Sequence, residues 1–360
     1  MAQHKNQQIE IDRLLSYALE TGASDLHLLI GKPPIVRVDS ELIAVNDYEV
    51  YDKEALEKLI DAFLDEKTKA RLSKDRQVDF SYDFRNKARF RVNVYYQKGS
   101  PAGALRYIPS KIRTLEELNM PPQIGDLVKS KQGLILVVGP NGHGKSTTMA
   151  ALIDMINHER NGHIITIEDP IEYIFVQDKS IISQREVYQD TESFVQAITS
   201  TVREDVDVVM IGEMRDLESI SAAVTVAETG HLVVATLHTN DAPQTIDRIV
   251  DIFPSHQQNQ IRSQLANMLI GVVSQRLLPR VGGGRLPAVE IMIANTAVQN
   301  LIREGKSYEL YNVIHTSGAL GMVSLDNSLA NLVKQGLVKM EHAQGYAKDQ
   351  DTFKTLVRRF

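Results

Sequence analysis

The segment Gly139–Ser146 has residue types and a spacing that suit the binding of phosphate groups. Its sequence, GPNGHGKS, fits the pattern GxxxxGK[ST] at every fixed position. Glycines let successive backbone N–H groups turn inward around phosphate oxygens, and a helix that starts at the loop adds a favourable dipole. In such a loop Lys145 reaches the β- and γ-phosphates, and the Ser146 hydroxyl is a ligand for Mg²⁺. We therefore expect a nucleoside triphosphate with Mg²⁺ to be bound by Gly139, Asn141, Gly142, His143, Gly144, Lys145, Ser146 and Thr147.

The residues on either side of this loop predict the structure that the chemistry needs. Leu134–Val138 is a short apolar run that predicts a buried strand. Thr147–Asn157 contains no glycine or proline and predicts a helix. Because phosphate-binding loops join a strand to the start of a helix, this context disfavours a chance match in a glycine-rich turn.

Two further predicted strands end in acidic residues. Glu168 follows His163–Ile167, and Glu213 closely follows Asp207–Ile211. A carboxylate at such a strand end, the Walker B arrangement, can hold Mg²⁺ through water or polarise an attacking water molecule. One acidic strand end is common and often structural, but two of them behind a phosphate loop favour function. We expect Glu213 to be the catalytic carboxylate, with Glu168 as the second acidic group, and both to serve the metal with Ser146.

Histidines flank the strand predicted at Leu232–Leu237, with His231 before it and His238 after it. A lone histidine near a sheet is more often structural than functional, but a histidine beside a nucleotide site can sense the γ-phosphate. We expect this catalytic role for His238 rather than for His231, because nothing in the local sequence aims His231 at phosphate. No ligand set at zinc spacing surrounds either residue.

Residues 1–108 predict a smaller α+β domain with a mainly antiparallel sheet. Within it, Ala88–Gln97 alternates strictly, with Phe90 and Val92 on one face. The predicted helices are Ile9–Thr21 and Lys53–Leu64, and the predicted strands are Asp25–Ile30, Pro34–Val38, Gln77–Phe84, Ala88–Gln97 and Ala102–Ile108.

Arginines lie on the polar side of these strands. Arg89 and Arg91 share a face of one strand, and Arg106 lies in the next. Phosphoryl transfer benefits from a guanidinium supplied across a domain or subunit interface. The spacing alone favours the simpler reading of a solvated strand face.

Residues 109–123 predict a linker, since prolines surround a short turn there. From residue 124 to 360 strands alternate with helices, which predicts an α/β domain with a parallel sheet and ligands at the carboxyl ends of its strands. The region from Asn295 onward predicts helices, interrupted at Gly305 and near Gly318. The predicted strands are Leu134–Val138, His163–Ile167, Asp207–Ile211, Leu232–Leu237 and Ala288–Ile293.

The composition narrows the class of protein. Of the 360 residues 43% are hydrophobic and 24% charged, as is ordinary for a soluble globular protein. No apolar run is long enough to cross a bilayer, and the polar N-terminus does not resemble a signal peptide. The chain has no cysteine, so no disulfide or cysteine-bound metal is possible. These features suit the cytoplasm, and the net charge of −6 argues against nucleic acid as the main partner.

Together these motifs resemble those of the secretion ATPase superfamily. Thr166–Glu172 looks like its Asp box, Gly212–Asp216 like its Walker B segment and Thr229–Thr239 like its His box, and Ser24–Leu28 resembles the start of its N-terminal PAS-like domain. Within the superfamily the chain most closely resembles the PilT-type retraction motors of type IV pili, and Gly282–Arg285 and Asn300–Glu304 look like features of that branch.

The resemblance implies a cytoplasmic homo-hexamer at the inner-membrane base of the pilus machine. Its RecA-like ATPase domain would hydrolyse ATP with Mg²⁺, retract pili by acting on the inner-membrane platform protein and support twitching motility. Glu213 would match the catalytic glutamate of the family, and Arg91 and Arg106 its arginine fingers. Extension motors resemble the same family but usually carry a tetracysteine zinc motif, and this chain has no cysteine.

Four positions depart from the family's usual residues. Asn141 and His143 replace a threonine and a serine at variable positions of the phosphate loop, Val206 replaces a proline at the entry to a predicted strand, and Gln299 replaces an arginine. An alternative to the main motor is therefore an auxiliary or regulatory paralogue with low turnover. Its partner would be a paralogous retraction ATPase. A nucleic-acid motor of the RecA type is a further alternative, but the chain has no evident basic stretch interleaved with aromatic residues.

Overall fold

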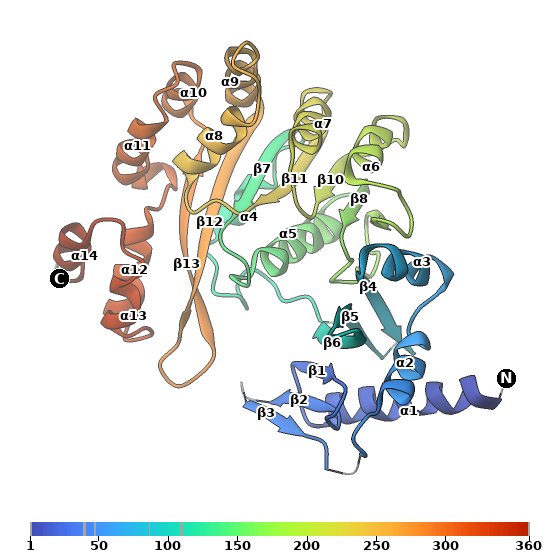
Figure 1. Cartoon of the computed structure of the whole chain (residues 1–360). Coiled ribbons are helices and arrows are strands. Elements are labelled where there is room, and N and C mark those ends of the chain that lie inside the picture. Colours follow the sequence, from blue (N-terminus) through green and yellow to red (C-terminus); the bar gives the residue numbers. More distant parts are fainter. Residues whose placement is uncertain (1, 39–40, 47, 86, 109–110, 359–360) are drawn as a thin grey trace. The chain divides into compact units, whose positions relative to one another are not determined.

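The computed structural model describes residues 2–38, 41–46, 48–85, 87–108 and 111–358 (Figure 1). The chain divides into two compact units. The first comprises Met1–Lys111 and Asp169–Ile174, and the second comprises Ile112–Glu168 and Phe175–Phe360. The sequence did not indicate that the short segment Asp169–Ile174, just after a core strand, groups with the N-terminal unit.

The N-terminal unit contains a six-stranded antiparallel sheet in the order β3-β2-β1-β6-β5-β4. Its apolar core forms where Phe90 and Val92 of β5 meet Leu14 of the first helix, all at most 1% exposed. The helices are α1 (Ala2–Glu20), α2 (Lys53–Asp61) and α3 (Glu66–Asp75), and the strands are β1 (Asp25–Leu28), β2 (Ile35–Val38), β3 (Glu41–Ala44), β4 (Gln77–Phe84), β5 (Ala88–Gln97) and β6 (Ser100–Ile108).

Most of the predicted elements of this unit are confirmed, and β4 and β5 have the predicted bounds. The prediction missed β3 and α3. All four residues of β3 are exposed, so that strand has no alternating pattern to detect. Helix α3 buries only Thr68 and Leu72, and its start is marked mainly by Asp65, whose side chain accepts a hydrogen bond from the Thr68 backbone.

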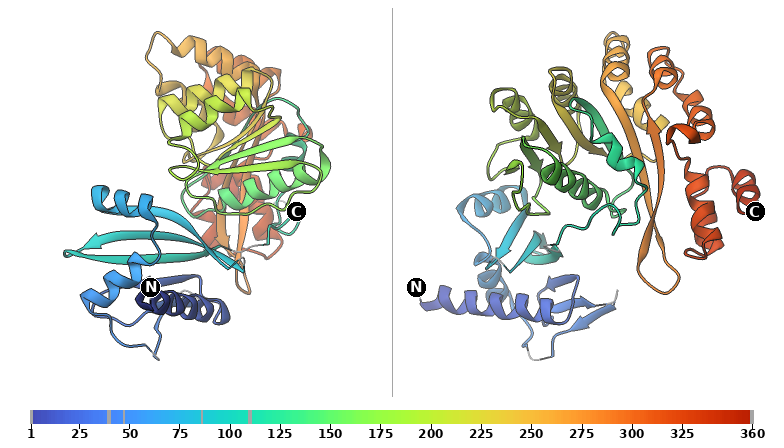
Figure 2. Two further views of the ribbon diagram at one scale, coloured as in Figure 1. Left: turned by 90° about the vertical axis from the view of Figure 1, so that its right-hand side faces the viewer. Right: turned by 180° about the vertical axis from the view of Figure 1, so that it is seen from behind.

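The second unit has a seven-stranded sheet in the order β13-β12-β7-β11-β10-β8-β9. Helix α5 covers one face, and α6, α7, α8 and α9 cover the other (Figure 2). The predicted α/β class with a parallel sheet is confirmed. The strands are β7 (Gly133–Val138), β8 (His163–Glu168), β9 (Ile181–Glu186), β10 (Val208–Ile211), β11 (Leu232–Leu237), β12 (Leu269–Pro279) and β13 (Arg285–Ile293).

One expectation for this sheet is wrong. The strand predicted at Ala288–Ile293 was placed among the parallel strands, but β13 pairs antiparallel with β12. The two strands form a hairpin, whose connection at Arg280–Gly284 is too short for a parallel crossover. Strands β9 and β12 were missed altogether; β12 carries three polar residues, Ser274, Gln275 and Arg276, inside an apolar run.

The helices of the second unit complete the fold. Val298 of α10 and Leu310 of α11 join the main core, whereas α12, α13 and α14 pack around Phe353 against the β12–β13 hairpin. None of the described helices has the length and apolar character needed to cross a membrane. The helices are α4 (Gln123–Leu127), α5 (Lys145–Glu159), α6 (Phe194–Ser200), α7 (Leu217–Glu228), α8 (Ala242–Asp251), α9 (Gln258–Met268), α10 (Thr296–Arg303), α11 (Leu310–Thr316), α12 (Leu325–Lys334), α13 (Met340–Gln344) and α14 (Gln350–Arg358), with 3₁₀ turns at Thr201–Arg203, Ser307–Glu309 and Gly318–Leu320.

Phe353 is fully buried at the centre of the C-terminal cluster. Phe353→Ala should weaken the attachment of α14 by about 3–5 kcal/mol, because it removes the aromatic ring and leaves a cavity. Amide hydrogen exchange in α14 should then become much faster. Leu320→Ala is the control, since that side chain is 62% exposed. Unchanged protection of α14 in the Phe353 variant would show that this ring does not hold the helix.

Candidate active site

The predicted phosphate loop joins the fully buried β7 to α5, as expected. Gly144 caps α5 in a left-handed conformation, with φ of 86°. Gly139 has φ of 147°, and a Cβ atom there would lie 2.6 Å from the carbonyl oxygen of Gln275. Both the backbone conformation and the close approach of β12 therefore require glycine at position 139.

The buried ammonium group of Lys145 crosses this loop. Its Nζ donates to the carbonyl oxygens of Gly139, at 2.8 Å, and Pro140, at 3.1 Å. The same nitrogen lies 3.2 Å from Nδ1 of His238. Because an ammonium can only donate, His238 Nδ1 is the acceptor, so the proton of a neutral His238 ring is on Nε2.

The carboxylate of Glu213 accepts a hydrogen bond from the Nε2–H group of His238. His238 Nε2 lies 2.7 Å from Oε1 of Glu213, and Arg215 Nη2 lies 2.8 Å from its Oε2. Burial alone would raise the pKa of Glu213, but hydrogen bonding and charge from Arg215, together with His238, lower that pKa below its ordinary value. The carboxylate is therefore ionised at neutral pH and can accept a proton or a hydrogen bond from water.

The order of the strands explains why these distant residues meet. β7, β11 and β10 are adjacent and parallel, so Lys145, His238 and Glu213 follow neighbouring strands at one edge of the sheet. The Thr236 hydroxyl of β11 donates a hydrogen bond to the Gly212 carbonyl, at 2.6 Å, and so joins β11 to the segment that follows β10. Glu168 ends β8, one strand further along, and is buried with its Oε1 accepting from Thr166 at 2.7 Å. The structure thus brings together three of the predicted catalytic and binding residues by direct contact, with Glu168 on the neighbouring strand.

The remaining histidines have different surroundings. His231 lies at the opposite end of β11, where its Nδ1 is 3.1 Å from the Val226 carbonyl oxygen. His143 belongs to the loop, and its Nδ1 accepts from the backbone of Leu277 at 2.9 Å. Burial and the neighbouring cations, Arg276 first among them, lower the pKa of His143. The His143 side chain is therefore held neutral against β12.

Gln275 of β12 supports the loop from below, a role that the sequence did not suggest. Its Oε1 accepts from Thr148 of α5 at 2.9 Å, and its Nε2 donates to the carbonyl oxygen of His143 at 2.5 Å. Gln275 is only 1% exposed. The available signal was the polar run Ser274–Arg276 in an apolar strand, because buried polar residues must find partners.

The two predicted arginine fingers lie in the N-terminal unit. Arg91 of β5 and Arg106 of β6 are paired directly across the strands. Arg106 donates to Asp25 at 2.9 Å but remains 69% exposed, whereas Arg91 lies 3.5 Å from Glu172 of the short segment in the same unit. The pairing places two guanidinium groups on one face of the sheet.

The predicted metal site offers few protein ligands. Within the described part of the chain, no group of three or more His, Asp or Glu side chains is arranged to hold a metal ion. Ser146 is exposed at the start of α5. One hydroxyl and the carboxylates of Glu168 and Glu213 suit Mg²⁺, because this ion keeps several waters and binds through few protein ligands together with phosphate oxygens.

Known proteins share both sequence and fold with this chain. The model of the type II/IV secretion system protein family matches residues 2–283. The type IV pilus retraction ATPase PilT of Pseudomonas aeruginosa is 44% identical over 96% of this chain and 100% of its own length. The type IV pilus ATPase PilU of the same bacterium is 36% identical over 97% of this chain and 92% of its own length.

A solved structure of the pilus retraction motor PilT with bound ADP has 47% identity and a TM-score of 0.89, and covers 96% of this chain and 99% of the solved chain. The phosphate loop, Glu168, Glu213 and His238 all lie in the region that the family model matches. This chain therefore belongs to the type II/IV secretion system protein family.

Proposed function

We propose that this protein is an ATP-hydrolysing motor that retracts type IV pili. The observation that carries the chemistry is the contact chain from Lys145 through His238 to Glu213 at the end of the phosphate loop. The direction of the motor rests on the near full-length similarity to proteins described as a pilus retraction ATPase and a pilus retraction motor.

The residues of the active site have distinct roles in this proposal. The loop amides and Lys145 bind the phosphates, and Glu213 orients the attacking water and accepts hydrogen bonding from it. Ser146 directly, and Glu168 and Glu213 through water, would hold Mg²⁺. That ion neutralises negative charge on the phosphate oxygens.

His238 would report the state of the phosphates to Glu213. The ammonium of Lys145 has three protons, and in the structure its acceptors include two loop carbonyls and His238. A phosphate oxygen that binds Lys145 competes with these acceptors. Any shift of His238 changes the hydrogen bond to Glu213, which links phosphate binding to the position of the catalytic carboxylate.

The family resemblance supports a hexameric ring, with residues 1–108 as the N-terminal domain, 109–123 as a linker and 124–360 as the ATPase domain. Arg91 and Arg106 would reach the nucleotide of another subunit, and the ring would act in the cytoplasm on the platform protein of the pilus machine. A paralogous retraction ATPase is a second expected partner, because the relatives include both PilT and PilU of one bacterium.

Gly139→Ala should reduce nucleotide affinity at least about 10-fold, because the methyl group clashes with β12 and the required φ is unfavourable for alanine. Titration with a fluorescent ADP analogue measures the effect. Gly318→Ala is the control, since nothing lies within 4 Å of its added Cβ. Normal affinity in folded Gly139→Ala protein would contradict the assigned loop geometry.

Glu213→Gln should lower ATP turnover by about 100-fold or more, because an amide is a poor proton acceptor, while nucleotide binding persists. Steady-state phosphate release and ATP binding are the two measurements. Glu218→Gln changes an exposed carboxylate of α7 and should leave both unaltered. If Glu213→Gln turns over at the normal rate, another residue is the catalytic carboxylate.

Arg91→Ala and Arg106→Ala should each impair turnover by about 10-fold or more without loss of nucleotide binding, as expected for arginine fingers. Lys74→Ala in α3 is the matched control. Mixing Arg91→Ala with Glu213→Gln subunits should restore some activity if Arg91 acts on a neighbour, because some interfaces then have two intact halves. No recovery in rings shown to be mixed would contradict action between subunits.

Deleting the gene in cells with fluorescently labelled pili tests the cellular function. Many long pili that no longer shorten would establish the main retraction motor. Normal shortening would indicate the auxiliary role, and cells without pili would reverse the proposed direction. Strong stimulation of the purified ATPase by single-stranded DNA would instead favour a nucleic-acid motor.

A further inference from the structure

The loop that carries His238 is short and is anchored beyond the active site. Four residues, 238–241, separate the end of β11 from the start of α8. On the inner side, Arg276 Nη2 donates to both the carbonyl and the side-chain oxygen of Asn240, at 2.9 and 3.0 Å. Because the loop is so short, a displacement of its far end is transmitted to His238.

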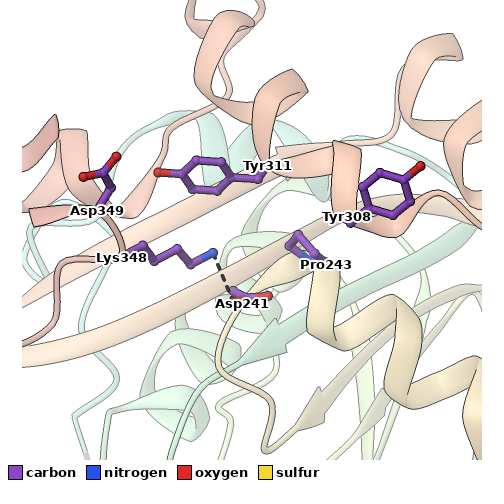
Figure 3. Close-up of a pocket in the computed structure, with 6 residues that line it drawn as sticks. All are labelled: Asp241, Pro243, Tyr308, Tyr311, Lys348 and Asp349. Atoms are coloured by element: carbon purple, nitrogen blue, oxygen red, sulfur yellow. Dashed lines mark ion pairs between the residues drawn. The ribbon is translucent and has the colours of Figure 1, made fainter. Parts of the chain in front are cut away.

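Lys348 supplies the anchor at that far end. It lies between α13 and α14, and its Nζ is 3.1 Å from Oδ2 of Asp241 and 2.9 Å from Oε2 of Glu290 (Figure 3 shows the Lys348–Asp241 pair). Asp241 caps α8 by accepting from Gln244, and Glu290 Oε1 accepts from the backbone of Ala242 at 2.9 Å. One ammonium group thus joins both carboxylates that fix the first turn of α8.

The segment around Lys348 is itself held firmly. The fully buried carboxylate of Asp326 in α12 accepts from the backbone N–H of Lys348 at 2.8 Å and of Asp349 at 3.2 Å. It also accepts from the Tyr311 hydroxyl at 3.0 Å, and the Tyr311 ring lies 5.2 Å from the Lys348 amine. Lys348 is therefore presented to α8 by a fixed support rather than by a free loop.

We propose that Lys348 is a positioning residue for ATP hydrolysis, which holds the His238 loop in register with Glu213 from the C-terminal helices. The inference rests on the proposed ATPase function. It also gives the C-terminal helices a route to the active site, because any load that shifts the segment at Lys348 pulls on the start of α8. Glu290 is fully buried, and this burial raises the pKa of its carboxyl group, while the charge of Lys348 opposes the rise.

Lys348→Met should lower kcat about 10-fold or more and change the KM for ATP by less than about twofold, because small displacements of catalytic groups are costly whereas the phosphate loop stays intact. Amide exchange at residues 238–242 should become faster. Lys348→Arg should keep at least about half of the wild-type kcat, since a guanidinium can still bridge the two carboxylates and a pocket of about 350 Å³ adjoins the side chain. Lys334→Met, an exposed change in α12, is the control.

The double variant Glu290→Gln/Lys348→Met separates positioning from stability. It removes both members of the buried ion pair, so its thermal midpoint should recover towards wild type, while kcat should stay low because Asp241 still lacks its anchor. Full recovery of kcat in the double variant would overturn the proposal, as would wild-type kcat in folded Lys348→Met. If Lys348→Met does not fold, the double variant decides. Absence of ATPase activity in the wild-type protein would instead refute the proposed function.

Discussion

The buried ammonium of Lys145 is the interaction on which the rest of the active site depends. A cation removed from water needs acceptors in fixed places, and here the phosphate loop and His238 provide them. The loop can fold around this ammonium because residue 139 is a glycine. Strand β12 approaches so closely there that no larger residue fits. His238 can reach it because β11 lies directly beside β7. Loop conformation, strand order and the orientation of one imidazole ring are thus parts of a single geometric requirement.

The contacts that lead away from Lys145 connect this cation to a neutral ring, then to an anion and finally to a second cation. The neutral His238 ring stands between this ammonium and the Glu213 carboxylate, which Arg215 neutralises on its other side. Such a chain stabilises the ionised form of Glu213 while leaving its oxygens partly accessible, which is the state a water-activating carboxylate needs. The Lys348–Asp241–Glu290 cluster repeats this logic outside the site, where one cation fixes two carboxylates at the start of α8.

Local sequence patterns predicted those features that short-range rules govern. The phosphate loop, the acidic strand ends and the alternating strand Ala88–Gln97 depend on residues near one another in the chain, and each has a strong spacing signal. The direction of β13 depends instead on pairing with β12, whose polar run obscured it as a strand. Gln275 and Lys348 belong to no sequence motif, because their partners are distant in the chain: His143 is 132 positions from Gln275, and Glu290 is 58 positions from Lys348.

Residue patterns alone predicted that a phosphate loop follows a strand, that carboxylates and a histidine follow other strands, and that an antiparallel domain precedes them. Periodicity and glycine placement are sufficient for such statements, since both follow from backbone geometry. The folded chain was needed to show which strand ends are neighbours, which tautomer His238 adopts, and which polar side chains of β12 and the C-terminal segment support the loops. Those properties arise from the burial of polar groups against distant parts of the chain, where each donor and acceptor must find a partner.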